Sequence, residues 1–96
     1  MGYKIIFAPQ ALERLAGIVR LIAQSNPDIA LRFGMKLIDA VELLSDFPEL
    51  GPPYRKRPNV RRIWSKPYFI YYRIEHNQKR IEIMDYWHSA RRDPEL

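Results

Sequence analysis

The sequence contains no cysteine and only two histidines, His76 and His88. Without cysteine the chain can form no disulfide, no thiolate metal site and no cysteine nucleophile. The lack of disulfides is consistent with a protein that works in a reducing cytosol. The two histidines have no paired spacing to acidic residues, so we expect neither a metal ion nor any other cofactor. His76 falls in a polar segment and receives no predicted role.

Long apolar runs are also absent. No segment approaches the roughly 20 apolar residues that a membrane-spanning helix needs, so we expect no membrane partner. The N-terminal stretch does not resemble a signal peptide, because Glu13 and Arg14 interrupt it. The chain shows no internal repeat and no low-complexity segment. We therefore expect a single domain over residues 1–96, with one core and a cytoplasmic location.

Negative charge is missing from one stretch of the second half. Residues 54–73 contain no Asp or Glu but seven cations, namely Arg55, Lys56, Arg57, Arg61, Arg62, Lys66 and Arg73. Residues 1–48 contain five basic and five acidic side chains, whereas residues 49–96 contain eleven and six, so the entire net charge of +5 lies in the second half. Aromatic residues are interspersed among these cations. This clustering favours a polyanionic or acidic partner.

The N-terminal half predicts a strand followed by two helices. Residues 3–7 are aromatic and β-branched and predict the strand. Residues 9–25 place apolar side chains at helical spacing, with Arg14 among the polar residues expected to face solvent. The second helix is expected to start at Asn26, whose side chain can cap it. A proline and an acidic residue follow Asn26 in the first turn of this helix. It should run to about Asp46, so that the two helices form an αα-hairpin.

The C-terminal half predicts three strands. Residues 60–65, 68–75 and 80–87 alternate in polarity, and a polar turn at residues 76–79 joins the last two. The order β-α-α-β-β-β predicts an α+β fold in which the αα-hairpin packs on one face of an antiparallel sheet. The first strand should join this sheet, because alone it could not satisfy its backbone groups. The face away from the helices is expected to stay open.

Three arginines on the predicted strands are candidates for a binding surface. Arg61 and Arg62 are adjacent on one strand, so their side chains point to opposite faces. One of them can lie on the open face, and the other is expected to cover the helix layer or to pair with a carboxylate. Arg73 has Glu75 and Glu82 as neighbours, so an ion pair and a binding role both remain open.

The aromatic residues of the strands allow two interpretations. Exposed rings can stack on nucleic acid bases, whereas in a small sheet aromatic side chains more often pack in the core or across strands. Tyr68 and Tyr72 fit the core interpretation. Tyr71 is expected to be the more exposed ring.

The order of several segments resembles a known family. After the N-terminal strand and helix, the chain continues with NPDIALRF, FPELGPPY, VRRIWSKPYFIYYRIE and IEIMDYWHSARRDP. In this order and spacing the segments resemble the RelE/ParE superfamily of toxins from bacterial toxin–antitoxin systems, over essentially the whole chain. The resemblance implies the α+β fold given above. It also implies a cognate antitoxin whose C-terminal segment wraps the toxin.

The resemblance is closer to the ParE branch, whose members poison DNA gyrase. RelE-like members place an arginine at the end of the strand before the tyrosine-led strand, where this chain has Trp64. The last strand closes with His88, and Asp93 follows an arginine pair, similar to the ending of ParE-like chains. The resemblance therefore implies a ParE-like toxin that binds and poisons DNA gyrase. The residues expected to contact the target are Arg61, Arg62, Arg73, His88, Arg91 and Arg92.

Two alternatives remain open. RelE-like members cut messenger RNA in the ribosome, which needs a base, an acid and cations that stabilise the phosphorane. If the chain is such a ribonuclease, His88 would be the acid or base, Arg73 and Arg61 phosphate clamps, and Tyr86 a stacking group or acid. The other alternative is a basic interaction domain of the same fold that has lost its activity.

Overall fold

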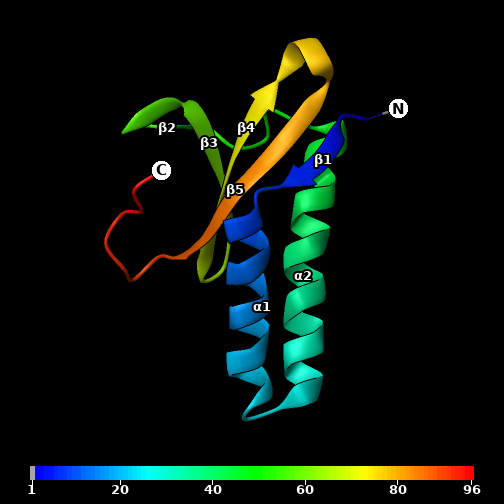
Figure 1. The fold of residues 1–96 in the computed structure, drawn as a ribbon, viewed down its shortest axis with the longest axis vertical. Coiled ribbons are helices and arrows are strands. Elements are labelled where there is room, and N and C mark those ends of the chain that lie inside the picture. Colours follow the sequence, from blue (N-terminus) through cyan, green and yellow to red (C-terminus); the bar gives the residue numbers. More distant parts are fainter. Residues whose placement is uncertain (1) are drawn as a thin grey trace.

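The computed structural model describes residues 2–96 as two α-helices packed on one face of a five-stranded sheet (Figure 1). The elements are β1 Lys4–Phe7, α1 Pro9–Ala23, α2 Pro27–Asp46, β2 Pro53–Tyr54, β3 Arg57–Ser65, β4 Tyr68–Glu75, the short 3-10 helix η1 His76–Gln78 and β5 Arg80–His88. The strand order across the sheet is β1-β5-β4-β3-β2. This arrangement confirms the predicted α+β class and the helical hairpin.

Both helices start where the sequence predicts. Asn26 Oδ1 accepts a hydrogen bond from the backbone N–H of Ile29 at 3.0 Å, a cap that contributes about 1 kcal/mol. The two helices approach closely at Gly34. A Cβ atom added to this glycine would lie 3.1 Å from Val19 Cγ2. Within residues 2–96, neither helix is both long and apolar enough to cross a membrane.

β1 joins the sheet as expected, but its direction corrects the prediction of a wholly antiparallel sheet. It pairs in parallel with β5, with Ile5 opposite Ile81 and Phe7 opposite Ile83. The backbone N–H of Ala8 donates to Ile83 O at 2.9 Å, and α1 starts immediately afterwards. Apolar alternation is the same for either strand direction, so the pattern alone could not give the orientation. The sheet is therefore mixed.

The structure also extends the predicted strands around the basic segment. β3 begins at Arg57, earlier than the predicted Val60, and β2 (Pro53–Tyr54) was not predicted. β2 is too short and too rich in proline to show an alternating pattern. Its pairing with β3 folds the proline-rich segment back along the sheet edge.

A β-bulge in β5 decides which of its side chains face the helices. Tyr71 pairs with Asp85 and Tyr72 with Ile83, so Met84 is an extra residue in β5. An extra residue shifts the alternation of a strand by one position. As a result, both Ile83 and Tyr86 reach the core under the helices.

The main core lies between the helices and the sheet. Its fully buried members include Leu37 and Leu44 from α2 and, from the sheet, Ile70, Tyr72, Ile81, Ile83 and Tyr86. Tyr68 packs against this cluster. The assignment of Tyr68 and Tyr72 to the core is thus confirmed.

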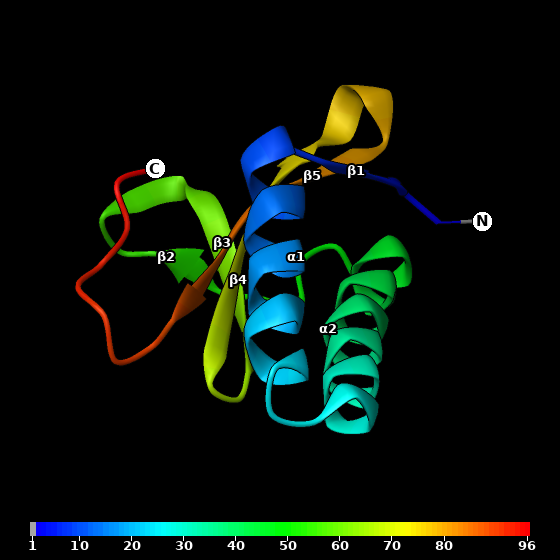
Figure 2. The ribbon, with the colours of Figure 1, turned by 60° about the horizontal axis from the view of Figure 1, so that its bottom comes forward.

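The face of the sheet away from the helices, here called the far face, carries a second and smaller core. Tyr54, Val60 and Tyr71 form it, and Leu96 packs against them. The predictions of an open face and an exposed Tyr71 are therefore wrong, since Tyr71 is only 1% exposed. The physical reason is that the C-terminal tail (residues 89–96) returns over this face, where Leu96 packs against the cluster, and that Tyr54 of the edge strand β2 completes it (Figure 2). Neither segment has an alternating pattern that could have predicted this cover.

Candidate functional site

Arg62 on β3 lies among aromatic rings on the far face. Its guanidinium carbon is 3.8 Å from the ring centroid of Phe69 and 5.1 Å from that of Tyr54. Its Nη1 donates to Tyr71 Oη at 3.0 Å. A cation held over aromatic faces is stabilised by the ring quadrupoles. Arg62 therefore keeps a fixed position on the far face while part of its side chain remains accessible.

Arg61 points to the opposite side, as the alternation predicts. Its Nη1 donates to Gly51 O at 2.7 Å, and its Nη2 lies 3.7 Å from Glu49 Oε2. Tyr72 braces the same loop, because its Oη accepts from the Gly51 N–H and donates to Pro48 O. The structure thus places Arg61 in the support of the loop before β2. It does not place Arg61 beside Arg62 on the far face.

Arg73 forms the ion pair that the sequence analysis left open. Its Nε lies 2.7 Å from Glu82 Oε1 across the hairpin of β4 and β5. The neighbouring pair joins Arg80 Nε and Glu75 Oε1 at 2.7 Å, and this guanidinium holds the pKa of Glu75 below its usual range. Such exposed pairs contribute little to stability. Arg73 is therefore largely neutralised, although it is not buried.

A groove separates α1 from the strand ends near His88. It has a volume of about 700 Å³ and is lined by Gln10, Glu13, Arg14, Gly17, Ile18, Leu21, Tyr68, Tyr86, His88 and Arg91. The Nδ1 atom of His88 accepts from the Ala90 N–H at 3.0 Å. In the neutral ring the proton is then on Nε2, which can donate to a ligand. Of the predicted target-contacting residues, the structure brings His88 and Arg91 together here.

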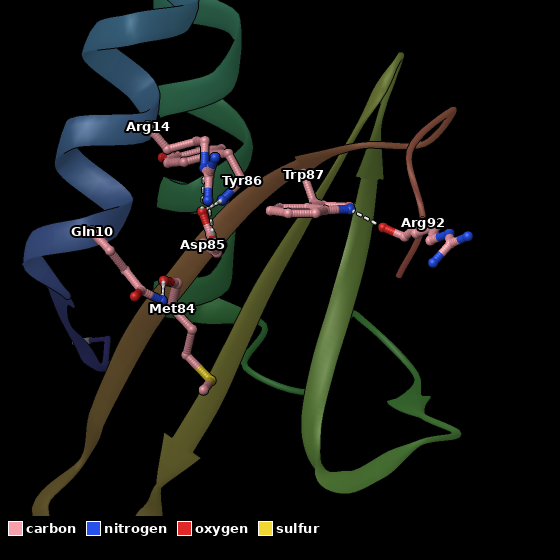
Figure 3. A network of polar contacts seen from close by, with 7 residues as sticks. All are labelled: Gln10, Arg14, Met84, Asp85, Tyr86, Trp87 and Arg92. Atoms are coloured by element: carbon pink, nitrogen blue, oxygen red, sulfur yellow. Dashed lines mark hydrogen bonds and ion pairs between the residues drawn. The ribbon is translucent and has the colours of Figure 1, made fainter. Parts of the chain in front are cut away.

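Arg14, which lines this groove, forms an ion pair that the sequence analysis missed (Figure 3). Arg14 Nε lies 3.1 Å from Asp85 Oδ1, and Arg14 Nη2 lies 3.3 Å from Oδ2. Asp85 is only 4% exposed and also accepts from the Tyr86 N–H. The sequence analysis expected Arg14 to face solvent, whereas its side chain is only 38% exposed and is paired with Asp85. An acid flanked by Met84 and Tyr86 in a strand was the signal that could have revealed the pair.

At the end of β5, two arginine side chains lie next to the ring of Trp87. The guanidinium carbons of Arg14 and Arg91 each lie 4.8 Å from the Trp87 ring centroid. Trp87 Nε1 donates to the backbone oxygen of Arg92 and so ties the tail to the sheet (Figure 3). The Arg92 residue itself is exposed. Cation–aromatic contacts of this kind hold charged groups at a surface without removing their charge.

Tyr86 does not lie where a stacking group or acid would be needed. It is fully buried, and its Oη has no hydrogen-bond partner among the described residues. Burial raises the pKa of Tyr86 to about 12, because the charged phenolate is poorly solvated there. Its ring cannot stack on a base without a rearrangement of the core. Part of the Tyr86 residue nevertheless lines the groove that contains His88.

The four residues considered for ribonuclease chemistry are not gathered at one place. His88 pairs with Tyr68 at one end of β4, and Arg73 is five positions further along the same strand. At about 3.3 Å per residue this separates the two by roughly 16 Å. Arg61, opposite Tyr72, lies near the Arg73 end. Among residues 2–96 no group of His, Asp and Glu is arranged to hold a metal ion.

Comparisons with solved structures support the same fold. The chain superposes on a structure described as the chromosomal ParDE toxin–antitoxin system from P. aeruginosa with a TM-score of 0.76 and 19% identity, covering 90% of this chain and 95% of that one. The RelBE2 toxin–antitoxin complex from Mycobacterium tuberculosis gives 0.66 and 20%, covering 92% and 99%. The isolated E. coli RelE toxin gives 0.60 and 14%, covering 95% and 88%.

Sequence comparisons identify the family. A curated protein of Sinorhizobium fredii named "Putative toxin Y4kP" is 30% identical over 94 residues, which are 97% of this chain and 95% of that protein. The family model described as the ParE toxin of the type II toxin–antitoxin system parDE matches residues 5–93. This match includes every helix and strand except the first residue of β1. The chain therefore belongs to the ParE toxin family of type II toxin–antitoxin systems.

Proposed function

We propose that this protein is a ParE-like toxin that acts in the cytoplasm, inhibits growth by binding and poisoning DNA gyrase, and is neutralised by a cognate antitoxin. The observation that carries the proposal is the family match over residues 5–93. The structure adds a surface of cations held by aromatic rings. Of the residues considered for RNA cleavage, His88 and Tyr86 line one groove, whereas Arg61 and Arg73 lie toward the other end of β4. A binding surface of this kind suits inhibition by contact with a protein–DNA machine.

The proposed gyrase contacts lie around the tail and the strand ends next to it. His88, Arg91 and Arg92 lie at the end of β5 and in the tail, and Arg62 lies on the far face. Arg61 and Arg73 are weaker candidates, because both are already engaged with carboxylates or backbone oxygens of the chain itself. The proposed gyrase contacts are therefore His88, Arg91, Arg92 and Arg62.

The proposed antitoxin surface is the outer side of the helical hairpin. Large apolar side chains of the hairpin are exposed, namely Leu12, Leu21, Ile29, Leu31, Met35 and Leu43, of which Leu21 and Leu43 line hollows that border the sheet. An exposed apolar area of this kind often marks a partner surface. A disordered segment with acidic and apolar residues could fold onto it, and the net charge of +5 would favour its acidic side chains.

The first experiment is a supercoiling assay with purified gyrase, ATP and relaxed plasmid. We expect the folded protein to block supercoiling and to trap cleaved DNA linked to gyrase. The antitoxin encoded beside it, added at equal concentration, should restore supercoiling. If folded protein has no effect at a large excess over gyrase, the proposal of gyrase as target is wrong.

One observation favours a second candidate, ribosome-dependent cleavage of messenger RNA. His88 and Arg91 line one groove, which could hold a general acid beside a phosphate-binding cation. Cleavage should be assayed on translating ribosomes by mapping RNA ends. If His88 is the acid or base, His88→Ala should reduce the rate by about 10²–10⁴. Intact messenger with active ribosomes would exclude this candidate.

A further inference from the structure

A separate hollow beside β2 on the far face is strongly cationic. It has a volume of about 600 Å³ and is lined by Pro52, Pro53, Tyr54, Arg55, Lys56, Arg62 and Asp93. We call it the Lys56 hollow. Three of its lining side chains are cations, and only Asp93 is acidic. Asp93 comes from the tail, so the chain supplies its own anion to this hollow.

The contact of Asp93 with the hollow is direct but not buried. Lys56 Nζ lies 2.6 Å from Asp93 Oδ2, and the two side chains remain 67% and 46% exposed. The Lys56 ammonium, with a smaller contribution from Arg62, holds the pKa of the Asp93 carboxyl below its usual range. An exposed pair of this kind contributes little to stability. Another anion can therefore replace the carboxylate at small cost.

Two further groups in the hollow lack an anionic partner. Tyr54 is only 5% exposed, yet its buried Oη has no hydrogen-bond partner among the described residues. A buried hydroxyl without a partner is unfavourable, although this oxygen has almost no exposed surface of its own. Arg62 donates one hydrogen bond, to Tyr71, and within residues 2–96 no carboxylate lies within ion-pair distance of it. Its remaining N–H groups are free to bind an oxyanion.

We propose that the Lys56 hollow binds the phosphate groups of a nucleic acid backbone, and that Asp93 occupies it until a phosphate displaces the carboxylate. Phosphate is favoured over an acidic peptide by the surplus of cations, since a phosphodiester backbone presents charge repeatedly. The guanidinium of Arg62 also matches phosphate geometry.

The surface next to the hollow suits the base attached to such a phosphate. Trp64 is 54% exposed, and its ring centroid lies 4.9 Å from that of Phe69. Phe69 in turn packs under Arg62. An exposed ring beside a cationic groove is the arrangement that binds single-stranded nucleic acid by stacking. The inference does not depend on the gyrase proposal, because binding of naked nucleic acid is measured without gyrase.

The test is fluorescence anisotropy with a short labelled single-stranded DNA and an RNA of the same sequence, at several salt concentrations. Comparison of the DNA with the RNA identifies which nucleic acid supplies the phosphate. Asp93→Asn removes the competing charge and should tighten binding about two- to fivefold beyond its control. The matched control is Glu95→Gln, which makes the same charge change in the same tail outside the hollow. Equal effects of the two variants would overturn the proposed displacement.

Lys56→Ala tests the site itself. Loss of one phosphate contact should weaken binding and reduce the salt slope, log Kd against log salt, by about 0.7. The control is Lys66→Ala, since Lys66 is an exposed lysine of the β3–β4 turn that does not line the hollow. Equal losses for both lysines would mean non-specific attraction and would overturn the site.

A third reagent separates phosphate from carboxylate ligands. A polyglutamate peptide that binds in a Lys56-dependent manner, with no binding of either oligonucleotide, would overturn the nucleic acid assignment. Circular dichroism of each variant confirms that it is folded, and the exposed positions of Lys56 and Asp93 make misfolding an improbable cause of any change. Chemical shift changes at Lys56 and Tyr54, but not at Lys66, would locate the bound oligonucleotide in the hollow.

Discussion

The two faces of the sheet are covered by different kinds of structure. The helical hairpin covers one face and buries large aliphatic residues such as Leu37 and Leu44 together with Tyr72 and Tyr86. The far face is covered by β2 and the tail, which bury a smaller cluster around Tyr71. There the cover is fastened largely by polar contacts, including the Lys56–Asp93 pair and the Trp87–Arg92 hydrogen bond.

This difference indicates how strongly each face is held together. Burial of large apolar side chains contributes about 1.5–3 kcal/mol for each residue, whereas exposed ion pairs contribute less than about 1 kcal/mol. The helical face is therefore the more strongly packed of the two, and the ion pair that fastens the tail to the far face is weak. Three of the eleven cations of residues 49–96 line the hollow beside this tail, namely Arg55, Lys56 and Arg62.

The largest loss of stability is expected from a cavity in the core between the helices and the sheet. Leu37→Ala should lower the free energy of unfolding by about 2–5 kcal/mol, because it removes a fully buried side chain and leaves a cavity. Urea unfolding followed by circular dichroism measures this change. The matched control is Leu31→Ala on the same helix, whose side chain is 67% exposed. Similar losses for both variants would contradict the strong packing of the helical face.

A smaller effect is expected at alkaline pH. The folded-state pKa of Tyr86 is raised to about 12 from 10.0, so the native state keeps a proton that the unfolded chain releases from about pH 10 upward. Its contribution is complete below pH 10 and is lost as pH rises to 12, by roughly 2–3 kcal/mol. Tyr86→Phe should remove this part of the alkaline loss and leave stability at pH 7 unchanged or higher. A measured profile identical to that of the unmodified protein would contradict it.

The Arg14–Asp85 pair joins α1 to the bulge of β5. The next smaller loss of stability is expected when this pair is broken. Asp85→Ala should cost about 1–3 kcal/mol, because it removes a buried carboxylate that accepts hydrogen bonds from Arg14 and from the Tyr86 N–H. Arg14→Ala alone should cost at least as much, since it leaves the buried Asp85 carboxylate without its cation. A double-mutant cycle on thermal unfolding isolates their coupling. Strictly additive single changes would mean that the pair contributes nothing.

The smallest loss of stability is expected at Tyr71 on the far face, which can be compared directly with Tyr86 on the helical face. Tyr71→Phe should cost about 1 kcal/mol, because it removes only the hydrogen bond from Arg62. The ring remains in place and keeps its packing against Tyr54. Tyr71 and Tyr86 are both buried tyrosines on opposite faces, and only the first has a partner for its hydroxyl. If Tyr86→Phe proved the more damaging change at pH 7, the assignment of their contacts would be wrong.

Much of the fold could be predicted from local pattern. Helical spacing and the Asn26 cap located both helices, and alternation located β4 and β5 to within one residue. These signals are local, because they depend on which side of one element is buried. The direction of β1 and the bulge at Met84 could not be predicted, since both depend on pairing between distant segments.

The candidate site was predictable only in part. Concentration of cations in the second half identified the basic surface, and strand alternation correctly separated Arg61 from Arg62. The contacts that engage Arg61 and Arg73 with their own chain depend on the loop before β2 and on the hairpin. Arg14 was missed because its partner is on β5, far away in the sequence.

The sequence by itself determined the order of the elements other than β2 and the 3-10 helix, the class of fold, the family resemblance and the basic character of the second half. These properties follow from composition and from periodicity along short segments, which need no knowledge of distant contacts. Only the tertiary structure decided that the tail covers the far face, that Asp93 meets Lys56, and that Tyr54 and Tyr86 bury hydroxyls without partners. Irregular segments such as the tail have no repeating pattern, so their positions are set by the surface on which they come to lie.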